Sequence, residues 1–365
     1  MPEQSTGEQL RRLSVSAEGF GSGTALYAYI RWLNELLEKP DALFTQRYRP
    51  IVEAERESGA RRPFLSVITR TQGRRPAMLR EMLMSLAAQT DEDYELLLIG
   101  HRLSGEGRRE IDACLAEMPA SFRARTRRFE LDGGNRTAPL NLGFAHARGA
   151  YAAVLDDDDL VFDDWVQRFH EAAREAPGAI LHAYVVTQKW ETLPGGGERL
   201  RSVGAPGTEC CGDFELSRQL TVNLCPLLGL AFPTLYFQKW GLCFDESLST
   251  TEDWDYLMRL SPLAGVKDIR RPTGLYRLWQ NTENSQTAHP PLEWQENYER
   301  IRRKFRDTPI LFPAGSEKTG RVERRPPPTP RRARIKARWR RILPRPLWAL
   351  MRKTYRRLGG QKWLG

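Results

Sequence analysis

The sequence predicts an α/β protein in which a mostly parallel β-sheet is flanked by helices. From residue 63 onwards, segments with the apolar pattern of strands alternate with segments that have helical periodicity. The strand candidates are continuous apolar runs, which is typical of strands buried on both faces of a parallel sheet. Hydrophobic residues make up 40% of the 365 positions, enough to build a core around such a sheet.

The first 62 residues precede this alternating pattern and divide into two parts. Residues 1–23 are polar, and their GFGSG segment lacks the preceding strand and the following Lys-Ser/Thr pair of a phosphate-binding loop. We therefore expect a flexible linker there. Residues 24–62 carry apolar side chains at helical spacing and predict a helical preamble, which Pro40 and Pro50 should divide into short helices.

Residues 63–310 are predicted to form the main domain. Its first strands are expected at FLSVITRT (64–71), YELLLIG (94–100), RRFEL (127–131) and AYAAVLD (150–156), with helices between them. Further on, we expect a loop or hairpin region over 190–225, a helix capped by Thr251, a last strand over 273–279 and a closing helix over 292–305. Sheets of this kind bind ligands at the carboxyl ends of their strands, so the functional site is expected at that edge.

The C-terminal part carries the positive charge of the chain. Residues 321–365 hold 16 of the 56 Lys and Arg residues and one of the 46 Asp and Glu residues, so the rest of the chain is slightly acidic. Residues 311–330 are predicted to be a stiff Pro/Arg linker, and 331–365 to form basic amphipathic helices. Each helix has an apolar stripe on one face: Ile335, Trp339 and Ile342 in the first, and Leu347, Met351, Tyr355 and Leu358 in the second.

A basic tail of this composition has several interpretations. It could bind nucleic acid by counterion release, solubilise the chain, or pack back on the main domain. The apolar stripes favour a helix that lies on an anionic membrane surface, because a segment that only binds nucleic acid does not need them. We therefore expect a membrane surface as a partner of 331–365 and no nucleic acid.

The compartment is predicted from the start of the chain and from the cysteines. The opening MPEQSTGEQLRR lacks the apolar run of a signal peptide, and no stretch approaches the length of a membrane span. The five cysteines are an odd number without zinc-type spacing, and we expect them to be reduced thiols. The prediction is a cytoplasmic protein, peripheral at the inner face of the cytoplasmic membrane.

Six of the nine residues from Asp156 to Asp164 are aspartate, at the end of the fourth predicted strand. Asp163 and Asp164 directly precede a helical pattern and are interpreted as a helix N-cap and first-turn acid. Asp156 to Asp159 follow the strand with no helix start. They form either a solvated acidic turn or a site in which carboxylates hold a hard divalent cation, Mn²⁺ or Mg²⁺.

Several segments resemble, in order, those of family 2 glycosyltransferases with the GT-A fold. They are FLSVITRT, LMSLAAQTDEDYELLLIG, GGNRTAPLNLGFAHARGAYAAVLDDDD, FDESLSTTEDWDYLMRL and YRLW, between residues 63 and 285. The resemblance implies an inverting enzyme of bacterial surface-polysaccharide or glycolipid synthesis. Such an enzyme moves a sugar from a nucleotide diphosphate, with a UDP-sugar favoured, to a saccharide or lipid-linked acceptor.

The same resemblance implies roles for individual residues. Asp156 and Asp158 take the positions of the family's DxD motif and would hold the metal, Asp158 directly and Asp156 facing the ribose or a metal-bound water. A catalytic base is implied at Asp253, with Glu252 beside it to orient the acceptor. The alternative is that these two acids only complement the helix dipole. The residues implied to meet the nucleotide sugar are Thr69, Thr71, His101, Arg136, Asp156, Asp157 and Arg277.

Two departures from the family pattern leave a second function open. The aspartate that usually meets the nucleotide base is replaced by Gly100 and His101, and the usual metal-binding histidine by Trp279. A histidine at a strand end can also be purely structural, and Arg136 can be a surface arginine at a helix start. The third metal ligand would then come from water or diphosphate. The alternative function is a non-catalytic scaffold of the same fold in a membrane-associated assembly complex.

Overall fold

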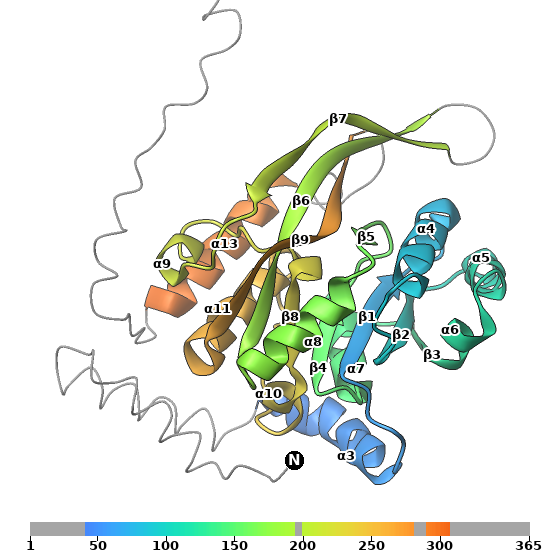
Figure 1. The fold of residues 1–365 in the computed structure, drawn as a ribbon. Helices are drawn as coiled ribbons and strands as arrows, with labels where there is room; N and C mark the ends of the chain where they lie inside the picture. Colours follow the sequence, from blue (N-terminus) through green and yellow to red (C-terminus); the bar gives the residue numbers. More distant parts are fainter. Residues whose placement is uncertain (1–40, 194–198, 281–289, 307–365) are drawn as a thin grey trace, which may run out of the picture. The chain divides into compact units, whose positions relative to one another are not determined.

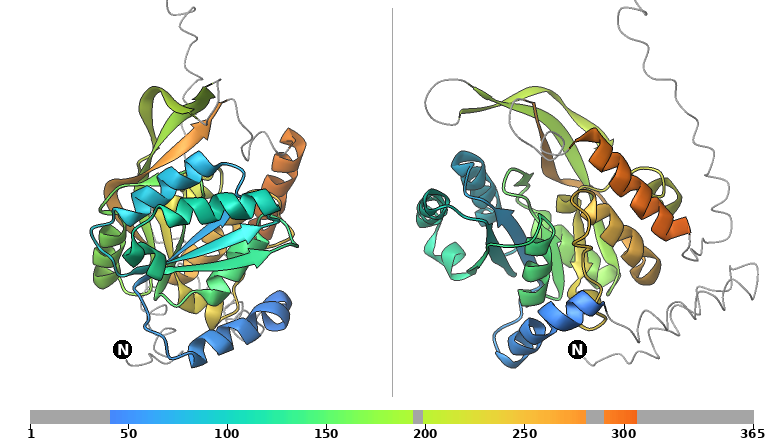
Figure 2. Two further views of the ribbon diagram at one scale, coloured as in Figure 1. Left: turned by 90° about the vertical axis from the view of Figure 1, so that its right-hand side faces the viewer. Right: turned by 180° about the vertical axis from the view of Figure 1, so that it is seen from behind.

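The computed structural model describes residues 41–193, 199–280 and 290–306 (Figures 1 and 2). These residues form one nine-stranded sheet in which the order is β3-β2-β1-β4-β8-β6-β9-β5, with β7 paired to β6. The strands are β1 (Leu65–Thr71), β2 (Tyr94–His101), β3 (Thr126–Leu131), β4 (Tyr151–Val154), β5 (Leu160–Val161), β6 (Ile180–Leu193), β7 (Arg199–Cys210), β8 (Leu230–Pro233) and β9 (Val266–Trp279).

Helices cover both faces of this sheet (Figure 1). The longer ones are α3 (Arg49–Glu57), α4 (Pro76–Ala87), α5 (Gly105–Ala116), α7 (Ala138–His146), α8 (Trp165–Glu175), α11 (Glu252–Ala264) and α13 (Pro291–Arg306). The short ones are η2 (Phe44–Tyr48), α6 (Ala120–Ala124), α9 (Leu216–Gln219), η3 (Leu227–Gly229) and α10 (Thr234–Gln238). Among the described residues, none of the helices has the length and apolar character needed to cross a membrane.

The sheet is buried on both faces because successive side chains of each central strand enter different cores. In β1, Val67 packs into the core under α4, α5 and α8, whereas Ile68 packs into the core under α3, α7 and α11. The four strands β3-β2-β1-β4 pair in parallel. This arrangement confirms the first four predicted strands and explains their continuous apolar runs.

Beyond β4 the sheet is mixed, which the sequence did not predict. The antiparallel pairs are β4 with β8, β6 with β8, β6 with β7 and β5 with β9, while β6 and β9 are parallel. The predicted hairpin region is present as β6 and β7, but β6 already begins at Ile180. Figure 1 shows this hairpin extending beyond the rest of the sheet. The predicted closing helix is present as α13.

Three local predictions were wrong. Asp164 precedes α8, but its side chain makes no capping hydrogen bond, and neither Asp163 nor Asp164 lies in the first turn of the helix. Pro50 does not separate two helices, because it occupies the first turn of α3 directly after the π-helical turn η2, where a proline loses no helical hydrogen bond. Thr251 precedes α11, but its side chain does not cap the helix. Its backbone is left-handed, with φ of 60°, and its hydroxyl donates to the carbonyl oxygen of Thr250. The part of the preamble before residue 41 and the tail lie outside the described residues.

Candidate active site

A cavity of about 230 Å³ lies where the carboxyl ends of β1 and β4 meet the amino end of α11. Its remaining walls come from the end of β7, from η3 and the segment before it, from β9 and from α13. Four of the sequence-predicted site residues line it, which places them together: Arg136, Asp156, Glu252 and Asp253. The cavity is therefore at the sheet edge where the strand pattern predicted a site.

Arg70 connects the acidic groups on this cavity, and the sequence analysis had missed it. Its Nε donates to Asp156 Oδ1 at 2.9 Å, and its Nη1 donates to Glu252 Oε1 at 2.8 Å. Arg136 shares the same oxygen of Glu252, with its Nε 3.1 Å away. The side chain of Arg70 is only 11% exposed, so the charges interact with little screening by water. The guanidinium of Arg70 thus connects β1, the acidic loop that follows β4, and helix α11.

The arginines keep two of the acids ionised. Although burial would raise the pKa of Asp156, the positive charge of Arg70 holds it below its usual range. Burial opposes ionisation of Glu252 in the same way, and the charges of Arg136 and Arg70 lower its pKa. Glu252 is therefore a stable anion that orients two guanidinium groups, which makes it a weak proton acceptor.

Asp253 has the opposite electrostatic environment. Burial and then the neighbouring carboxylate of Glu252 raise the pKa of Asp253 to about 6. Its Oδ1 accepts a hydrogen bond from the backbone N–H of Trp254 at 2.7 Å, and its Oδ2 accepts one from Asn223 Nδ2 at 3.2 Å. A carboxylate with a pKa near neutrality is well matched to general-base catalysis. Of the two acids at the start of α11, Asp253 is the one with the properties of a base.

The next two aspartates pair with a second arginine that the sequence analysis did not single out. Arg75 Nη1 donates to Asp158 Oδ2 and Arg75 Nη2 to Asp157 Oδ1, both at 2.6 Å. The other oxygen of Asp157 accepts from Thr71 Oγ1 at 2.6 Å. Burial raises the pKa of Asp158 against the effect of Arg75. Thr71 therefore contacts the acidic loop itself.

Arg277 lies behind the acidic loop and is fully buried. Its backbone N–H donates to Asp159 Oδ1 at 2.9 Å, its Nε donates to the carbonyl oxygen of Asp158, and its Nη1 pairs with Glu81 Oε2 at 2.5 Å. Its guanidinium also lies 5.2 Å from the ring centroids of both Trp190 and Trp279. In this structure Arg277 holds the acidic loop in place and does not line the cavity.

Thr69 and His101 also lie off the cavity. The hydroxyl of Thr69 is buried and donates to the carbonyl oxygen of Leu155 at 2.8 Å, which fixes the start of the acidic loop on β1. His101 Nε2 lies 3.1 Å from the carbonyl oxygen of Gly133, and burial lowers the pKa of its imidazole. Alternation along β1 explains the placement of Thr69, because Arg70 has the opposite orientation and reaches the cavity.

The acidic loop can be tested for its fit to a divalent cation. Carboxylate oxygens are the ligands that Mn²⁺ and Mg²⁺ prefer, and Asp158 Oδ1 makes no hydrogen bond within the described part of the chain. However, the described residues contain no group of three or more His, Cys, Asp or Glu side chains that converge as ligands. The donor chemistry fits such an ion, provided that further ligands come from diphosphate or water.

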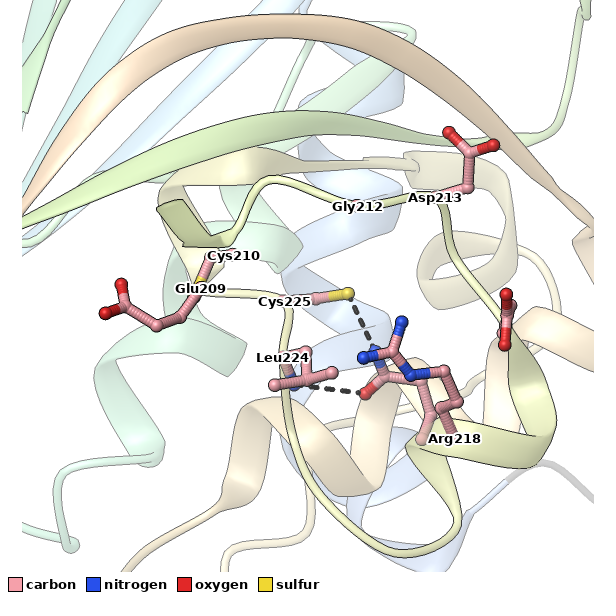
Figure 3. Close-up of a pocket in the computed structure, with 9 residues that line it drawn as sticks. Glu209, Cys210, Gly212, Asp213, Arg218, Leu224 and Cys225 are labelled. Atoms are coloured by element: carbon pink, nitrogen blue, oxygen red, sulfur yellow. Dashed lines mark hydrogen bonds between the residues drawn. The ribbon is translucent and has the colours of Figure 1, made fainter. Parts of the chain in front are cut away.

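A much smaller pocket, of about 20 Å³, adjoins this region at the end of β7 (Figure 3). Gln219 closes it by donating from Nε2 to Cys225 Sγ at 3.1 Å, and its backbone oxygen accepts from the indole of Trp254 at 2.8 Å. Burial raises the pKa of Cys210 to about 11, so its thiol stays protonated near neutral pH. All five cysteines are free thiols, as predicted. Through its hydrogen bond to Trp254, Gln219 fixes this region to α11, the helix that carries Asp253.

Comparison with solved structures shows which class of fold this protein has. TarS of S. aureus, residues 1–349 in complex with UDP-GlcNAc, has a similar fold with a TM-score of 0.53 and 16% identity, covering 70% of each chain. The complex of the same TarS segment with UDP gives 0.50 and 14%, over 70% of this chain and 69% of that one. At such identities the similarity shows the fold, which is that of the GT-A-like glycosyltransferases.

Matches in sequence point to the same class of protein. Residues 66–205 match the sequence model described as "Glycosyl transferase family 2". The chain is 26% identical over 200 residues to an uncharacterized glycosyltransferase of Rickettsia felis, covering 51% of this chain and 30% of that protein. It is 25% identical over 230 residues to the uncharacterized protein y4gI of Sinorhizobium fredii, covering 62% and 23%. The chain thus spans less than a third of these relatives, and its residues 66–205 resemble a family 2 glycosyltransferase domain.

Proposed function

We propose that this protein is an inverting glycosyltransferase that moves a sugar from a nucleotide diphosphate to a hydroxyl group of a saccharide or lipid-linked acceptor. The observation that carries the proposal is the pair of carboxylates at the start of α11. Asp253 has a pKa near neutrality and faces the same cavity as Asp156, Arg70 and Arg136. A base and a cluster of guanidinium groups on one cavity are the requirements for displacing a diphosphate.

In the proposed reaction Asp253 accepts the proton of the acceptor hydroxyl while that oxygen attacks the anomeric carbon of the donor. The bond from this carbon to the diphosphate oxygen breaks in the same step, with its electron pair leaving on the diphosphate. Arg70 and Arg136 supply fixed positive charge on the cavity wall as the negative charge of the leaving group develops. Attack from the side opposite the leaving group inverts the anomeric centre.

A divalent cation, Mn²⁺ or Mg²⁺, is part of the proposal. Asp156 and Asp158 would hold it, and when bound it would neutralise charge on the leaving diphosphate. In the present structure both carboxylates are engaged by arginines, Asp156 by Arg70 and Asp158 by Arg75. Asp158 Oδ1 accepts no hydrogen bond within the described residues, so the cation can bind there while Oδ2 keeps its contact with Arg75. Both oxygens of Asp156 accept from Arg70, so a direct bond from Asp156 to the cation requires Arg70 to release one of them.

UDP is proposed as the nucleotide of the donor, because TarS segments of similar fold were crystallised with UDP and UDP-GlcNAc. We expect UDP with Mn²⁺ to raise the melting temperature more than GDP, dTDP, CDP or CMP, and more than UDP alone. A ligand at 100 times its Kd stabilises a protein by about 2.7 kcal/mol. A thermal-shift panel with and without Mn²⁺ measures this.

The matched variants for this panel come from the same aspartate run. Asp158→Ala should abolish the Mn²⁺-dependent part of the shift. Asp163→Ala should retain it, because the Asp163 side chain is exposed and lies outside the cavity. A panel in which no nucleotide shifts the wild-type protein would contradict the transferase proposal and favour the non-catalytic scaffold.

We also propose that the enzyme acts in surface-polysaccharide or glycolipid synthesis at the cytoplasmic face of a membrane, with residues 331–365 on the lipid surface. The support is the sequence of this segment, which lies outside the described residues. The full chain should co-sediment with phosphatidylglycerol vesicles and not with phosphatidylcholine vesicles, and salt should weaken the binding.

Two pairs of substitutions in the full chain separate lipid insertion from charge attraction. Ile335→Ser with Trp339→Ser removes two of the three residues of the first apolar stripe and should reduce vesicle binding, whereas Ala333→Ser with Ala337→Ser changes the opposite face and should not. Binding to duplex DNA without binding to vesicles would contradict the membrane proposal and support nucleic-acid recognition instead.

A further inference from the structure

One wall of the cavity differs in chemistry from the wall that carries the arginines. Trp294 and Tyr298, one helical turn apart on α13, line it together with Leu227 and Asn223. This wall combines aromatic and aliphatic surface with an amide. Neither Trp294 nor Tyr298 was singled out from the sequence, because the pattern of α13 is that of an ordinary amphipathic helix.

Contacts with α11 and with the segment that precedes it hold this wall in place. Asn297 Nδ2 donates to Thr250 Oγ1 at 2.8 Å, just before Glu252. Further along α13, Lys304 Nζ lies 2.7 Å from the buried carboxylate of Asp255. Ile301 packs into a small core with residues of α11, among them Trp254. The helix that carries the aromatic wall is therefore fixed to the helix that carries Asp253.

Trp294, one of the residues that line the cavity, has an unsatisfied polar group. Its indole Nε1 is buried and has no hydrogen-bond partner within the part of the chain that the structure describes. Leaving a buried donor unpaired is destabilising, so native proteins usually supply a partner. Trp294 itself lines the cavity, so a bound molecule whose oxygen reaches Nε1 would supply the missing acceptor.

The position of Tyr298 places the aromatic wall beside the proposed base. The centroid of its ring lies 4.8 Å from the ring centroid of Trp254, the residue that follows Asp253. Burial and then the charge of Asp253 raise the pKa of the Tyr298 hydroxyl, as expected for two groups on the same cavity. A ligand on the aromatic wall would thus have its polar edge close to Asp253.

We propose that Trp294 and Tyr298 form the subsite for the acceptor, and that the acceptor group bound there is a sugar ring. This inference rests on the proposed function. A pyranose presents an apolar C–H face that can pack on aromatic rings and a rim of hydroxyl groups that can accept from the Trp294 N–H and the Asn223 amide. A hydrocarbon chain would satisfy neither donor, which argues against a lipid tail in this position.

The test uses the full chain with UDP and four methyl glycosides, those of glucose, galactose, mannose and N-acetylglucosamine. Saturation-transfer NMR measures glycoside binding, and calorimetry measures the Kd of UDP. At least one glycoside should bind the wild type. Trp294→Ala should weaken it by about tenfold or more, and Trp294→Phe, which retains a ring but loses the N–H, by about 2–10-fold. The Kd of UDP should change by less than about twofold.

Trp240→Phe is the matched control, because Trp240 packs on Tyr236 and does not line the cavity. Glycoside binding that is unchanged in both Trp294 variants would overturn the subsite. Binding of geranyl phosphate, with no binding of any glycoside, would also overturn the subsite. The same holds if UDP binds and no glycoside does. If UDP fails to bind but glycosides bind in a Trp294-dependent way, the subsite stands and the donor proposal fails.

Discussion

Asp253→Asn should lower the rate of sugar transfer by about 10²–10⁴-fold while leaving UDP binding within about twofold of the wild type. The amide cannot accept the proton of the acceptor hydroxyl. Its carbonyl oxygen can still accept the 2.7 Å hydrogen bond from the backbone N–H of Trp254, so the start of α11 should keep its conformation. Transfer from a UDP-sugar to the glycoside that binds best measures the rate, and calorimetry measures UDP binding.

The pH dependence provides an independent check on the same residue. Asp253 must be ionised to act as a base, and its pKa is raised to about 6. The rate should therefore rise with pH through this value and fall to roughly a tenth of its plateau at pH 5. The residual activity of Asp253→Asn should lack this step.

Asp213→Asn is the control for the general effect of removing a carboxylate. Asp213 is exposed and pairs with Arg270 at the surface, outside the cavity, so the rate should not change. Transfer by Asp253→Asn at a rate close to that of the wild type would show that another group is the base. Loss of UDP binding in this variant would show that Asp253 acts on the donor side.

The parallel half of the fold could be predicted from the sequence because its information is local. A continuous apolar run such as YELLLIG has to be buried on both faces, and the helices between such runs carry helical periodicity. The hairpin of β6 and β7 has no such signal. Most of β7 is exposed, including Val203, and its sequence combines Gly, Pro and Arg residues in the manner of a loop.

The candidate site was predictable in its acids and not in their partners. Asp156 and Asp253 stand out in the sequence because they lie at a strand end and a helix start. The shared partner of Asp156 and Glu252 is Arg70, which lies 182 positions before Glu252, and only the fold brings these two side chains to 2.8 Å. Strand alternation in the segment TRT could have indicated it, because Arg70 must have the opposite orientation to Thr69 and Thr71.

The second large effect is expected from Arg70→Met, which should destabilise the protein by about 3–5 kcal/mol, because it leaves ionised carboxylates without their buried partner. Urea unfolding followed by circular dichroism measures this. Arg61→Met is the matched control, since Arg61 is 87% exposed and its pair with Asp93 should contribute at most about 1 kcal/mol. A loss no larger than that of Arg61→Met would contradict the role of Arg70 as the organising cation.

The loss of stability in Arg70→Met should also depend on the carboxylates that pair with Arg70. Combining Arg70→Met with Asp156→Asn and Glu252→Gln should recover part of the stability, because the uncompensated charges then disappear together with the guanidinium.

The stability of the protein should depend on pH for the same reason. Folded-state pKa values below the usual range make Asp156 and Glu252 stabilising above their unfolded pKa, and this contribution is lost as the pH falls through the folded values. Arg70→Met should remove most of the contribution of Asp156 and reduce that of Glu252, which keeps Arg136 as a partner.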